Sequence, residues 1–273
     1  MLRPRYIQGE DHKLFMIERG SRTDARGIVI FVPPFAEEMN RCRRMITKQS
    51  ERLVALGYCC VVPDLSGTGD SFGALQDADL ERWRNDLTAC RSACELDKRM
   101  PVYVIAIRLG AILAASWIIE DQVPLKGLVL WSPVLSGAKY MSQFLRLRSL
   151  SAMLSGSGKR ETESDLLHEL HDRGLLEVAG YTISPRLYRS ISEAGLADGL
   201  LRLTAPICWL EVAANSAVSP SRPASSTVEK LRNARVDVQF AAVSGDKFWT
   251  TVETTTAPAV MDRTESFIEL GPC

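Results

Sequence analysis

Hydrophobic positions along the chain form short, continuously apolar runs that alternate with longer amphipathic segments. The runs are rich in β-branched residues and are bounded by proline, glycine or polar loops. This pattern is typical of strands that are buried on both faces of a sheet. We expect strands at residues 14–18, 27–33, 58–63, 102–107, 125–131, 207–212 and 236–243.

The amphipathic segments predict helices between these strands. In residues 79–97, for example, the apolar side chains recur at helical spacing on one stripe, as Leu80, Trp83, Leu87, Cys90 and Cys94. We expect helices at residues 39–56, 79–97, 111–119, 227–233 and 258–270. Such alternation favours an α/β fold, with a mostly parallel sheet and helices on both faces.

The alternation of strands and helices lapses between residues 134 and 203, where the sequence is rich in Leu, Ser, Arg and Gly and is helical only in pieces. We interpret this stretch as a helical cap inserted after the fourth buried strand. The predicted organisation is therefore one core domain, made of residues 1–133 and 204–273, with a cap at residues 134–203. A cap in this position would cover the carboxyl ends of the strands, where ligands bind in sheets of this kind.

Charge and cysteine content exclude several classes of function. The 33 basic and 33 acidic residues cancel, without a block of like charge, so we expect no nucleic-acid partner. The odd number of cysteines, 7, lies largely within periodic segments, which indicates reduced, buried thiols and a cytoplasmic protein. Cys90 and Cys94 have helical spacing and could share a metal, but packing is the simpler interpretation without a nearby histidine. We expect no signal peptide, no membrane span and no metal.

Three motifs lie, in order, at the ends of predicted strands. FVPPFAEEMN covers residues 31–40, DLSGTGDS covers residues 64–71, and VIAIRLGA joins a strand to a helix with Ala106 and Gly110 on either side of Arg108. Small residues at those two positions are typical of the strained turn called the nucleophile elbow. Together the motifs resemble the α/β-hydrolase fold. Because the glycines of DLSGTGDS lack the lysine and the spacing of a phosphate loop, we expect no nucleotide or other cofactor.

A closer resemblance is to the hydrolase-like proteins associated with the exosortase A system of Gram-negative bacteria, which are encoded among exopolysaccharide genes. It rests on PPFAEEMN followed by Arg43 and Arg44, then on DLSGTGDS and RLGA, and it covers roughly residues 28–135. The resemblance implies a genomic setting and a hydrolase label, but it does not imply a substrate.

Arginine stands at the elbow, where a hydrolase of this fold has serine. A guanidinium has no lone pair for attack and stays protonated, so Arg108 cannot be the nucleophile. Asn215 or Ser216 replaces the usual acid, with Glu211 close by, and Lys247 or Phe248 replaces the usual histidine. The histidines are His12, His168 and His171, which we expect away from the site. All three triad roles are therefore predicted to be lost together.

A cation at a helix N-terminus requires a nearby carboxylate, because the helix dipole favours an anion there. In the resembling fold the strand before PPFAEEMN lies beside the elbow strand. We therefore expect Glu37 or Glu38 to pair with Arg108, with Asp64 or Asp70 as the second choice. The pair could be a structural plug. Alternatively, Arg108 could bind an anionic group of the substrate while a glutamate with a raised pKa activates water.

The remaining candidates each have a simpler alternative. Ser71 and Ser132 could be displaced nucleophiles, but serine is common in turns. Lys247 could act as a desolvated base or lie on the surface, and Trp249, with Phe248 beside it, could line a pocket or belong to the core. Our predicted site is therefore Glu37, Glu38 and Arg108 as catalytic residues, with substrate contacts from Asp70, Ser132, Lys247 and Trp249.

Two functions remain open on the sequence. The first is a non-standard hydrolase or acyl transferase acting on an ester or acyl group, for instance on an acylated polysaccharide precursor. The second is a catalytically inert binding or scaffold protein in exopolysaccharide assembly. The expected ligand is a small molecule or an acylated carbohydrate, and a homodimer is left open. An open cavity lined by Glu37, Glu38, Arg108 and Trp249 would favour ligand chemistry, whereas a filled one would favour the scaffold.

Overall fold

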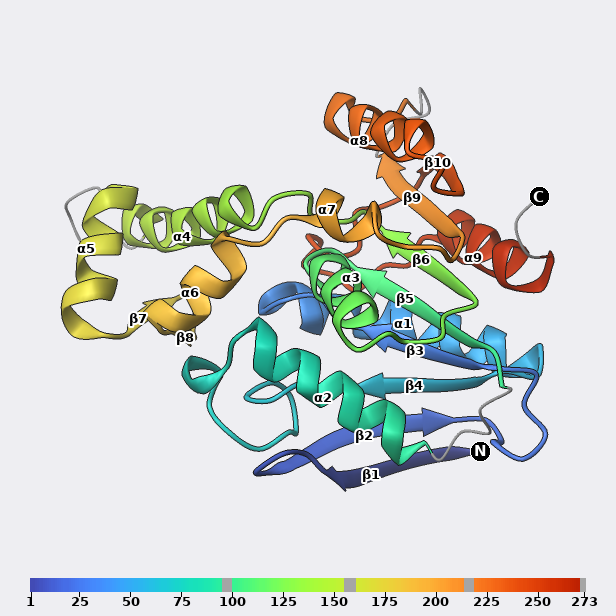
Figure 1. Cartoon of the computed structure of the whole chain (residues 1–273). Coiled ribbons are helices and arrows are strands. Elements are labelled where there is room, and N and C mark those ends of the chain that lie inside the picture. The colour runs from blue at the N-terminus through green and yellow to red at the C-terminus, as the bar shows by residue number, and fades with distance from the viewer. Residues whose placement is uncertain (95–99, 155–160, 214–218, 271–273) are drawn as a thin grey trace.

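The computed structural model describes residues 1–94, 100–154, 161–213 and 219–270. Its centre is an eight-stranded sheet with the order β1-β2-β4-β3-β5-β6-β9-β10 (Figure 1). The strands β4, β3, β5, β6, β9 and β10 pair in parallel, each with its neighbour in this order. At the other edge β1 pairs with β2, and β2 with β4, in antiparallel fashion. The strands are β1 Leu2–Gln8, β2 Lys13–Arg19, β3 Ile28–Val32, β4 Cys59–Pro63, β5 Val102–Ile107, β6 Gly127–Trp131, β9 Ile207–Ala213 and β10 Val238–Ser244.

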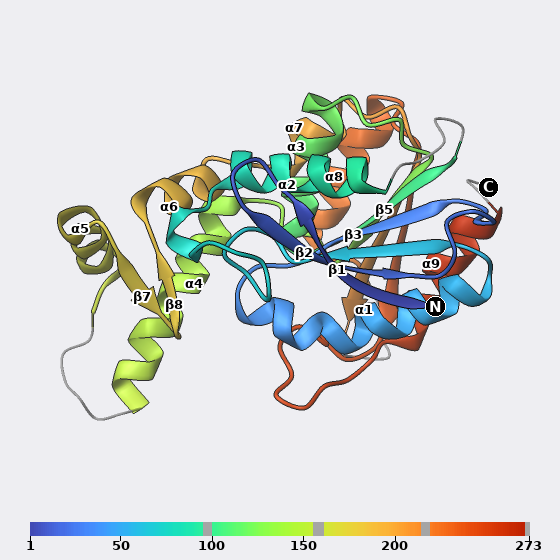
Figure 2. The ribbon, with the colours of Figure 1, turned by 90° about the horizontal axis from the view of Figure 1, so that it is seen from below.

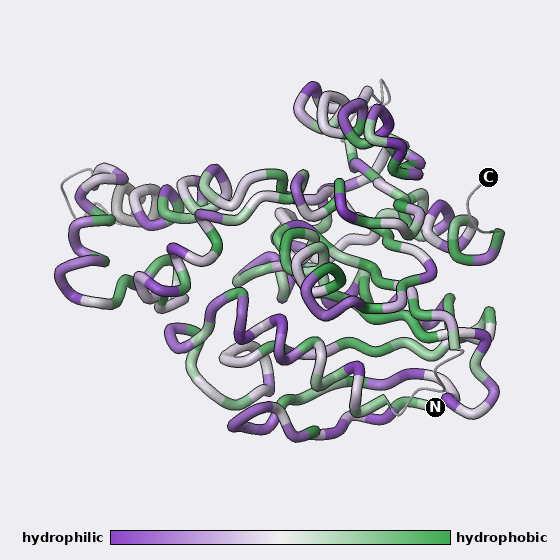
Figure 3. The backbone as a smooth tube through the Cα atoms, in the orientation of Figure 1, coloured by the Kyte–Doolittle hydropathy of each residue, from purple (hydrophilic) through white to green (hydrophobic). Residues whose placement is uncertain are grey.

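Helices cover both faces of this sheet. One face carries α1 (Glu37–Ala55) and α9 (Pro258–Leu270), and the other carries α2 (Leu80–Ala93), α3 (Gly110–Glu120) and α8 (Arg222–Asn233), as Figure 2 shows. Hydrophobic residues are concentrated along the central strands (Figure 3). Buried apolar residues of the helices pack against them in two clusters of the described residues. The predicted fold class, an α/β-hydrolase-like sheet with helices on both faces, is confirmed.

The segment between β6 and β9 extends away from the sheet as an arm (Figure 1). It contains α4 Gly137–Leu154, α5 Glu163–Arg173, β7 Leu176–Val178, β8 Tyr181–Ile183, α6 Pro185–Ser192 and α7 Leu196–Leu200. The β7–β8 hairpin was not expected from the sequence, because strands of three residues leave no readable alternation. Its two-residue turn has positive φ angles at Ala179 (51°) and Gly180 (83°), the combination that tight hairpins favour.

Strand β1 was also not predicted, since its proline and arginines do not look like a strand. It adds to the sheet edge by pairing with β2 over its full length. Its arginines meet Glu18, which is fully buried and lies 3.5 Å from both Arg3 and Arg5. Arg22 completes this ion-pair group at 2.5 Å from Glu18. Neutralising a buried carboxylate therefore explains the basic residues of this edge strand. The predicted end of α2 at residue 97 lies outside the described residues.

Candidate functional site

Arg108 occupies a strained turn between β5 and α3. Its φ of 54° is in the left-handed region, which non-glycine residues rarely adopt outside functional or tightly constrained positions. The turn brings α3 so close to β3 that a Cβ added to Gly110 would lie 2.5 Å from the carbonyl oxygens of Val32 and Pro33. Glycine is therefore required at residue 110. The sharp strand-to-helix turn has the geometry of a nucleophile elbow, with an arginine at its apex.

The Arg108 guanidinium is held on three sides. Its Nε donates to Oε1 of Glu38 at 3.2 Å, and its Nη1 donates to the carbonyl oxygen of Ser132 at 2.8 Å. One face of the guanidinium lies over the ring of Trp249, with Cζ 4.9 Å from the ring centroid, a cation–π distance. These contacts come from α1, from the end of β6 and from the loop after β10, so they fix the arginine between three parts of the core.

The carboxylate of Glu38 is held on both oxygens. Oε1 accepts from Arg108, and Oε2 accepts from the hydroxyl of Tyr140 at 3.1 Å. Burial raises the pKa of Glu38, while Arg108 opposes that rise. Burial and the nearby Glu38 hold the pKa of Tyr140 well above its usual range, so Tyr140 stays protonated and donates. We call Glu38, Arg108, Tyr140 and Trp249 the elbow cluster.

Of the expected partners of Arg108, the structure selects Glu38. The contact uses one nitrogen of the guanidinium, and therefore it is not a bidentate fork. Glu37 points elsewhere: it lies 3.3 Å from Arg41 and accepts from the hydroxyl of Tyr181 at 3.2 Å. The alternative partner Asp64 instead pairs with Arg43 at 3.3 Å.

The other predicted site residues divide into two groups. Trp249 joins the elbow cluster, and Ser132 contributes its carbonyl oxygen, while its hydroxyl accepts from the backbone N–H of Val212 at 3.0 Å. The structure does not bring Asp70 and Lys247 into the cluster, and both are exposed.

Two further candidates have structural roles. Phe248 is fully buried against Trp131, with ring centroids 5.9 Å apart. The Ser71 hydroxyl donates to the carbonyl of Asp64 at 2.6 Å and accepts from the N–H of Phe15. This serine therefore ties a loop to β2.

The loop after β9, where we expected the replacement of the catalytic acid, is only partly described by the structure. Asn215 and Ser216 lie outside the described residues. Glu211 is engaged by the N–H of Ser221 at 2.7 Å. His168 and His171 are exposed on α5 of the arm. None of these described side chains contacts Arg108.

Away from the elbow, a serine, a histidine and an aspartate lie together, and the sequence did not predict this group. Nε2 of His12 lies 2.6 Å from Oγ of Ser66, and that hydroxyl donates to Asp86 at 2.6 Å. The Ser66 hydroxyl donates to Asp86, so its proton is not directed to the His12 ring nitrogen in this arrangement. Ser66 is only 2% exposed. The group is therefore a buried hydrogen-bond network that joins the β1–β2 turn to α2. Its three residues are far apart in the sequence and form no motif, so it could not be predicted.

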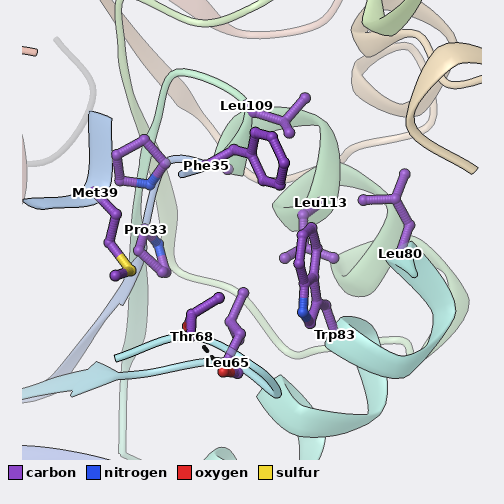
Figure 4. A pocket seen from close by; sticks show the side chains of 11 residues that line it. Pro33, Phe35, Met39, Leu65, Thr68, Leu80, Trp83, Leu109 and Leu113 are labelled. Carbon is purple, nitrogen blue, oxygen red and sulfur yellow. Dashed lines mark hydrogen bonds between the residues drawn. The ribbon is translucent and has the colours of Figure 1, made fainter. Parts of the chain in front are cut away.

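A small apolar cavity adjoins the elbow (Figure 4). Its free volume is about 20 Å³, room for about one water molecule. Leu109 and Gly110 of the elbow contribute to its wall, but Arg108, Glu38 and Trp249 do not. The remaining wall is formed by Pro33, Pro34, Phe35, Met39, Leu65, Thr68, Leu80, Trp83 and Leu113. The space beside the elbow is thus narrow and apolar, and the elbow cluster lies outside its wall.

The thiols and carboxylates do not form a metal centre in the described parts of the chain. The Cys94 thiol donates to the Cys90 carbonyl at 3.1 Å, and burial raises its pKa to about 11, so it is a protonated packing residue. No helix among the described residues is long and apolar enough to cross a bilayer.

Comparisons with known proteins agree with this geometry. The family model described as "Serine aminopeptidase, S33" matches residues 23–175. Est1E from Butyrivibrio proteoclasticus, solved with ferulic acid bound, has 16% identity, a TM-score of 0.70 and 97% coverage of each chain.

Two further solved structures share the fold. A proline iminopeptidase from Mycobacterium smegmatis has 14% identity, 98% coverage of each chain and a TM-score of 0.62. An esterase from Exiguobacterium antarcticum has 15% identity, covers 98% of this chain and 97% of its own, and has a TM-score of 0.60. No curated protein sequence matches the chain.

Proposed function

Because the chain belongs to the serine aminopeptidase S33 family of hydrolases, we propose that it is a member in which a catalytically inert binding or scaffold role has replaced serine hydrolysis. One observation carries this proposal: the residue at the elbow is an arginine whose guanidinium is engaged by Glu38, by the Ser132 carbonyl and by the Trp249 ring. A group held in this way fills the position from which a nucleophile would attack.

The energetics of the elbow cluster support a structural role for the pair. Arg108 and Glu38 have side chains that are each 18% exposed, so both charges are largely removed from water. Their mutual attraction and the hydrogen bonds from Tyr140 and to Ser132 offset that desolvation. A substrate could reach the elbow only if these contacts were broken, and the free energy required for this disfavours catalysis there.

A second candidate function is hydrolysis or acyl transfer with Glu38 as the base, on an ester or acyl group. It is favoured by the raised pKa of Glu38, which brings a carboxylate closer to the range of a general base. Glu38 would take a proton from water, the hydroxide would attack the ester carbonyl carbon, and the alkoxide would leave with the proton returned by Glu38. Arg108 would hold an anionic group of the substrate. This candidate needs a free lone pair of Glu38 to face water.

The biological setting follows from the motif resemblance. PPFAEEMN, DLSGTGDS and RLGA support a role beside exosortase-associated exopolysaccharide assembly, in the cytoplasm, with a small molecule or an acylated carbohydrate as ligand. The scaffold alternative belongs to the same setting, since an inert elbow leaves the surfaces of the fold free for binding.

The test is turnover of a panel of short acyl esters, aryl esters and acetylated sugars by the wild type, Glu38→Gln and Arg108→Ala. The control is Glu37→Gln, which changes the neighbouring exposed carboxylate. We expect no turnover above the buffer rate for any of the four proteins. Turnover by the wild type that Glu38→Gln abolishes and Glu37→Gln retains, in a folded protein, would overturn the binding role and establish the glutamate mechanism.

A further inference from the structure

A groove separates the cap hairpin from the loop that carries DLSGTGDS. It lies between β8, the first turns of α1 and the loop after β4, and its free volume is about 370 Å³. That volume is within the range of small-molecule sites, whereas the apolar cavity beside the elbow holds about 20 Å³. We call it the cap groove.

The lining of the cap groove combines apolar residues with uncharged hydrogen-bonding ones. Its hydrogen-bonding side chains are Asn40, Thr68, Gln76, Tyr181 and Thr182, and none of the described residues that line it carries a formal charge. Such a lining offers an ionic ligand no counter-charge. Amides and hydroxyls both donate and accept hydrogen bonds, and the tyrosine adds an apolar ring face.

The loop wall of the groove is held in one conformation. Gly69 has a φ of 54°, and a Cβ there would lie 2.0 Å from Oδ2 of Asp64, so only glycine fits. The same Asp64 oxygen accepts from the N–H of Asp70 at 2.9 Å. Thr68 is fixed by its N–H and its hydroxyl, which both donate to the Leu65 carbonyl, at 2.9 and 2.8 Å. A wall ordered in advance lowers the entropy cost of binding.

The cap wall of the groove is also tied to the core. The Tyr181 hydroxyl donates to Glu37 at 3.2 Å and accepts from Asn40 at 3.0 Å, which positions the ring beside the groove. Glu37 is neutralised by Arg41 at 3.3 Å. The side chain of Gln76 has no hydrogen-bond partner among the described residues and is half-buried, so its amide is free for a ligand.

We propose that the cap groove binds an uncharged, polyhydroxylated ligand of the saccharide class. The amide oxygen of Asn40, the amide of Gln76 and the hydroxyl of Thr182 supply acceptors and donors for hydroxyl groups, and the Tyr181 ring adds an apolar surface for a sugar ring. The inference rests on the proposed binding role, but it concerns a different surface from the elbow cluster. It also gives DLSGTGDS a role, since its glycine turn forms the loop wall.

The experiment applies the labelled full-length protein to an array of neutral glycans, acidic glycans and short peptides, then measures the affinity for the best-bound neutral glycan by calorimetry. We expect binding to neutral glycans only. Gln76→Leu, which removes a free amide and no internal bond, should weaken binding about tenfold. Tyr181→Ala should weaken it at least as much, whereas Tyr181→Phe should retain most of the affinity, because the ring is kept.

The matched control is Gln143→Leu, the same chemical change at an exposed position of α4 outside the groove, and it should bind as the wild type does. Absence of binding to every neutral glycan would overturn the inference, as would binding that Gln76→Leu and Gln143→Leu alter equally. Binding to acidic glycans or peptides alone would assign the groove to another ligand class and would also overturn it. Ester turnover is a separate readout, so failure of the proposed function can be told from failure of this inference.

Discussion

The elbow cluster and the cap groove lie on either side of the first turns of α1, and they use neighbouring residues in opposite ways. Glu38 faces the elbow and is held on both carboxylate oxygens, whereas Asn40 lines the groove and is exposed. The cluster is closed, charged and internally satisfied. The groove is open and uncharged, with an amide at Gln76 that makes no hydrogen bond to the part of the chain that the structure describes. Hydrogen-bonding groups that are paired within the protein contribute to its stability, whereas unpaired ones are available to bind a ligand.

The largest loss of stability is expected at Gly110, which allows the close approach of α3 to β3 at the elbow and does not line the groove. In Gly110→Ala the new Cβ would lie 2.5 Å from two backbone oxygens, so α3 or β3 must shift. We expect the free energy of unfolding to fall by about 3 kcal/mol, measured by chemical denaturation. Gly195→Ala is the control, because its backbone is extended (φ −132°) and its nearest atom is 3.9 Å away. Equal losses in both variants would mean that the elbow is not closely packed.

Removing the side chain of Glu38 should come next. Glu38→Ala leaves the Arg108 Nε–H and the Tyr140 hydroxyl without their acceptor in a largely buried site, so we expect the free energy of unfolding to fall by about 2 kcal/mol. Glu37→Ala, one residue away but half-exposed, should change it by no more than about 0.5 kcal/mol. If the two variants were equally stable, the elbow pair would behave as a surface ion pair and the contrast with the groove would weaken.

The free energy of unfolding should depend on pH through the ionisation of Glu38. Burial raises the pKa of Glu38 in the folded protein above its ordinary value of 4.5, so the folded state binds the proton more tightly than the unfolded state. The stability due to this group is therefore present below pH 4.5 and is lost as the pH rises from 4.5 through the raised pKa.

The measurement is the unfolding free energy of the wild type minus that of Glu38→Gln, across this range. The difference should decline as the pH rises, and more steeply when Arg108→Ala removes the cation that opposes the shift. A difference that grows with pH would show that Glu38 has a lowered pKa.

The smallest effect is expected from restoring the missing nucleophile. Arg108→Ser should hydrolyse p-nitrophenyl acetate no faster than the wild type, because no described histidine contacts residue 108. A large gain in rate would show that a hidden base serves the elbow.

Much of the fold could be predicted from the sequence, because buried parallel strands and amphipathic helices leave strong periodic patterns. A pairing of Arg108 with Glu37 or Glu38 was also predicted, because in the resembling fold the strand before PPFAEEMN lies beside the elbow strand, and the structure shows that the partner is Glu38. Strand β1 and the β7–β8 hairpin were missed, because a basic edge strand and three-residue strands carry almost no pattern.

The rest of the site depends on tertiary contacts. Tyr140 comes from α4, 102 positions from Glu38 along the chain, and the Ser132 contribution is a backbone carbonyl that no side-chain motif encodes. The cap groove combines residues of α1, the β4 loop and the hairpin, so it exists only once the hairpin has docked.

The central claim is that the elbow has no serine nucleophile in reach, and reaction of the wild-type protein with a fluorophosphonate probe tests it most directly. Intact mass spectrometry should show the unmodified mass after incubation with excess probe, alongside complete labelling of a serine esterase in the same tube. A stoichiometric adduct that peptide mapping assigns to a serine, such as Ser71 or Ser132, would contradict the account.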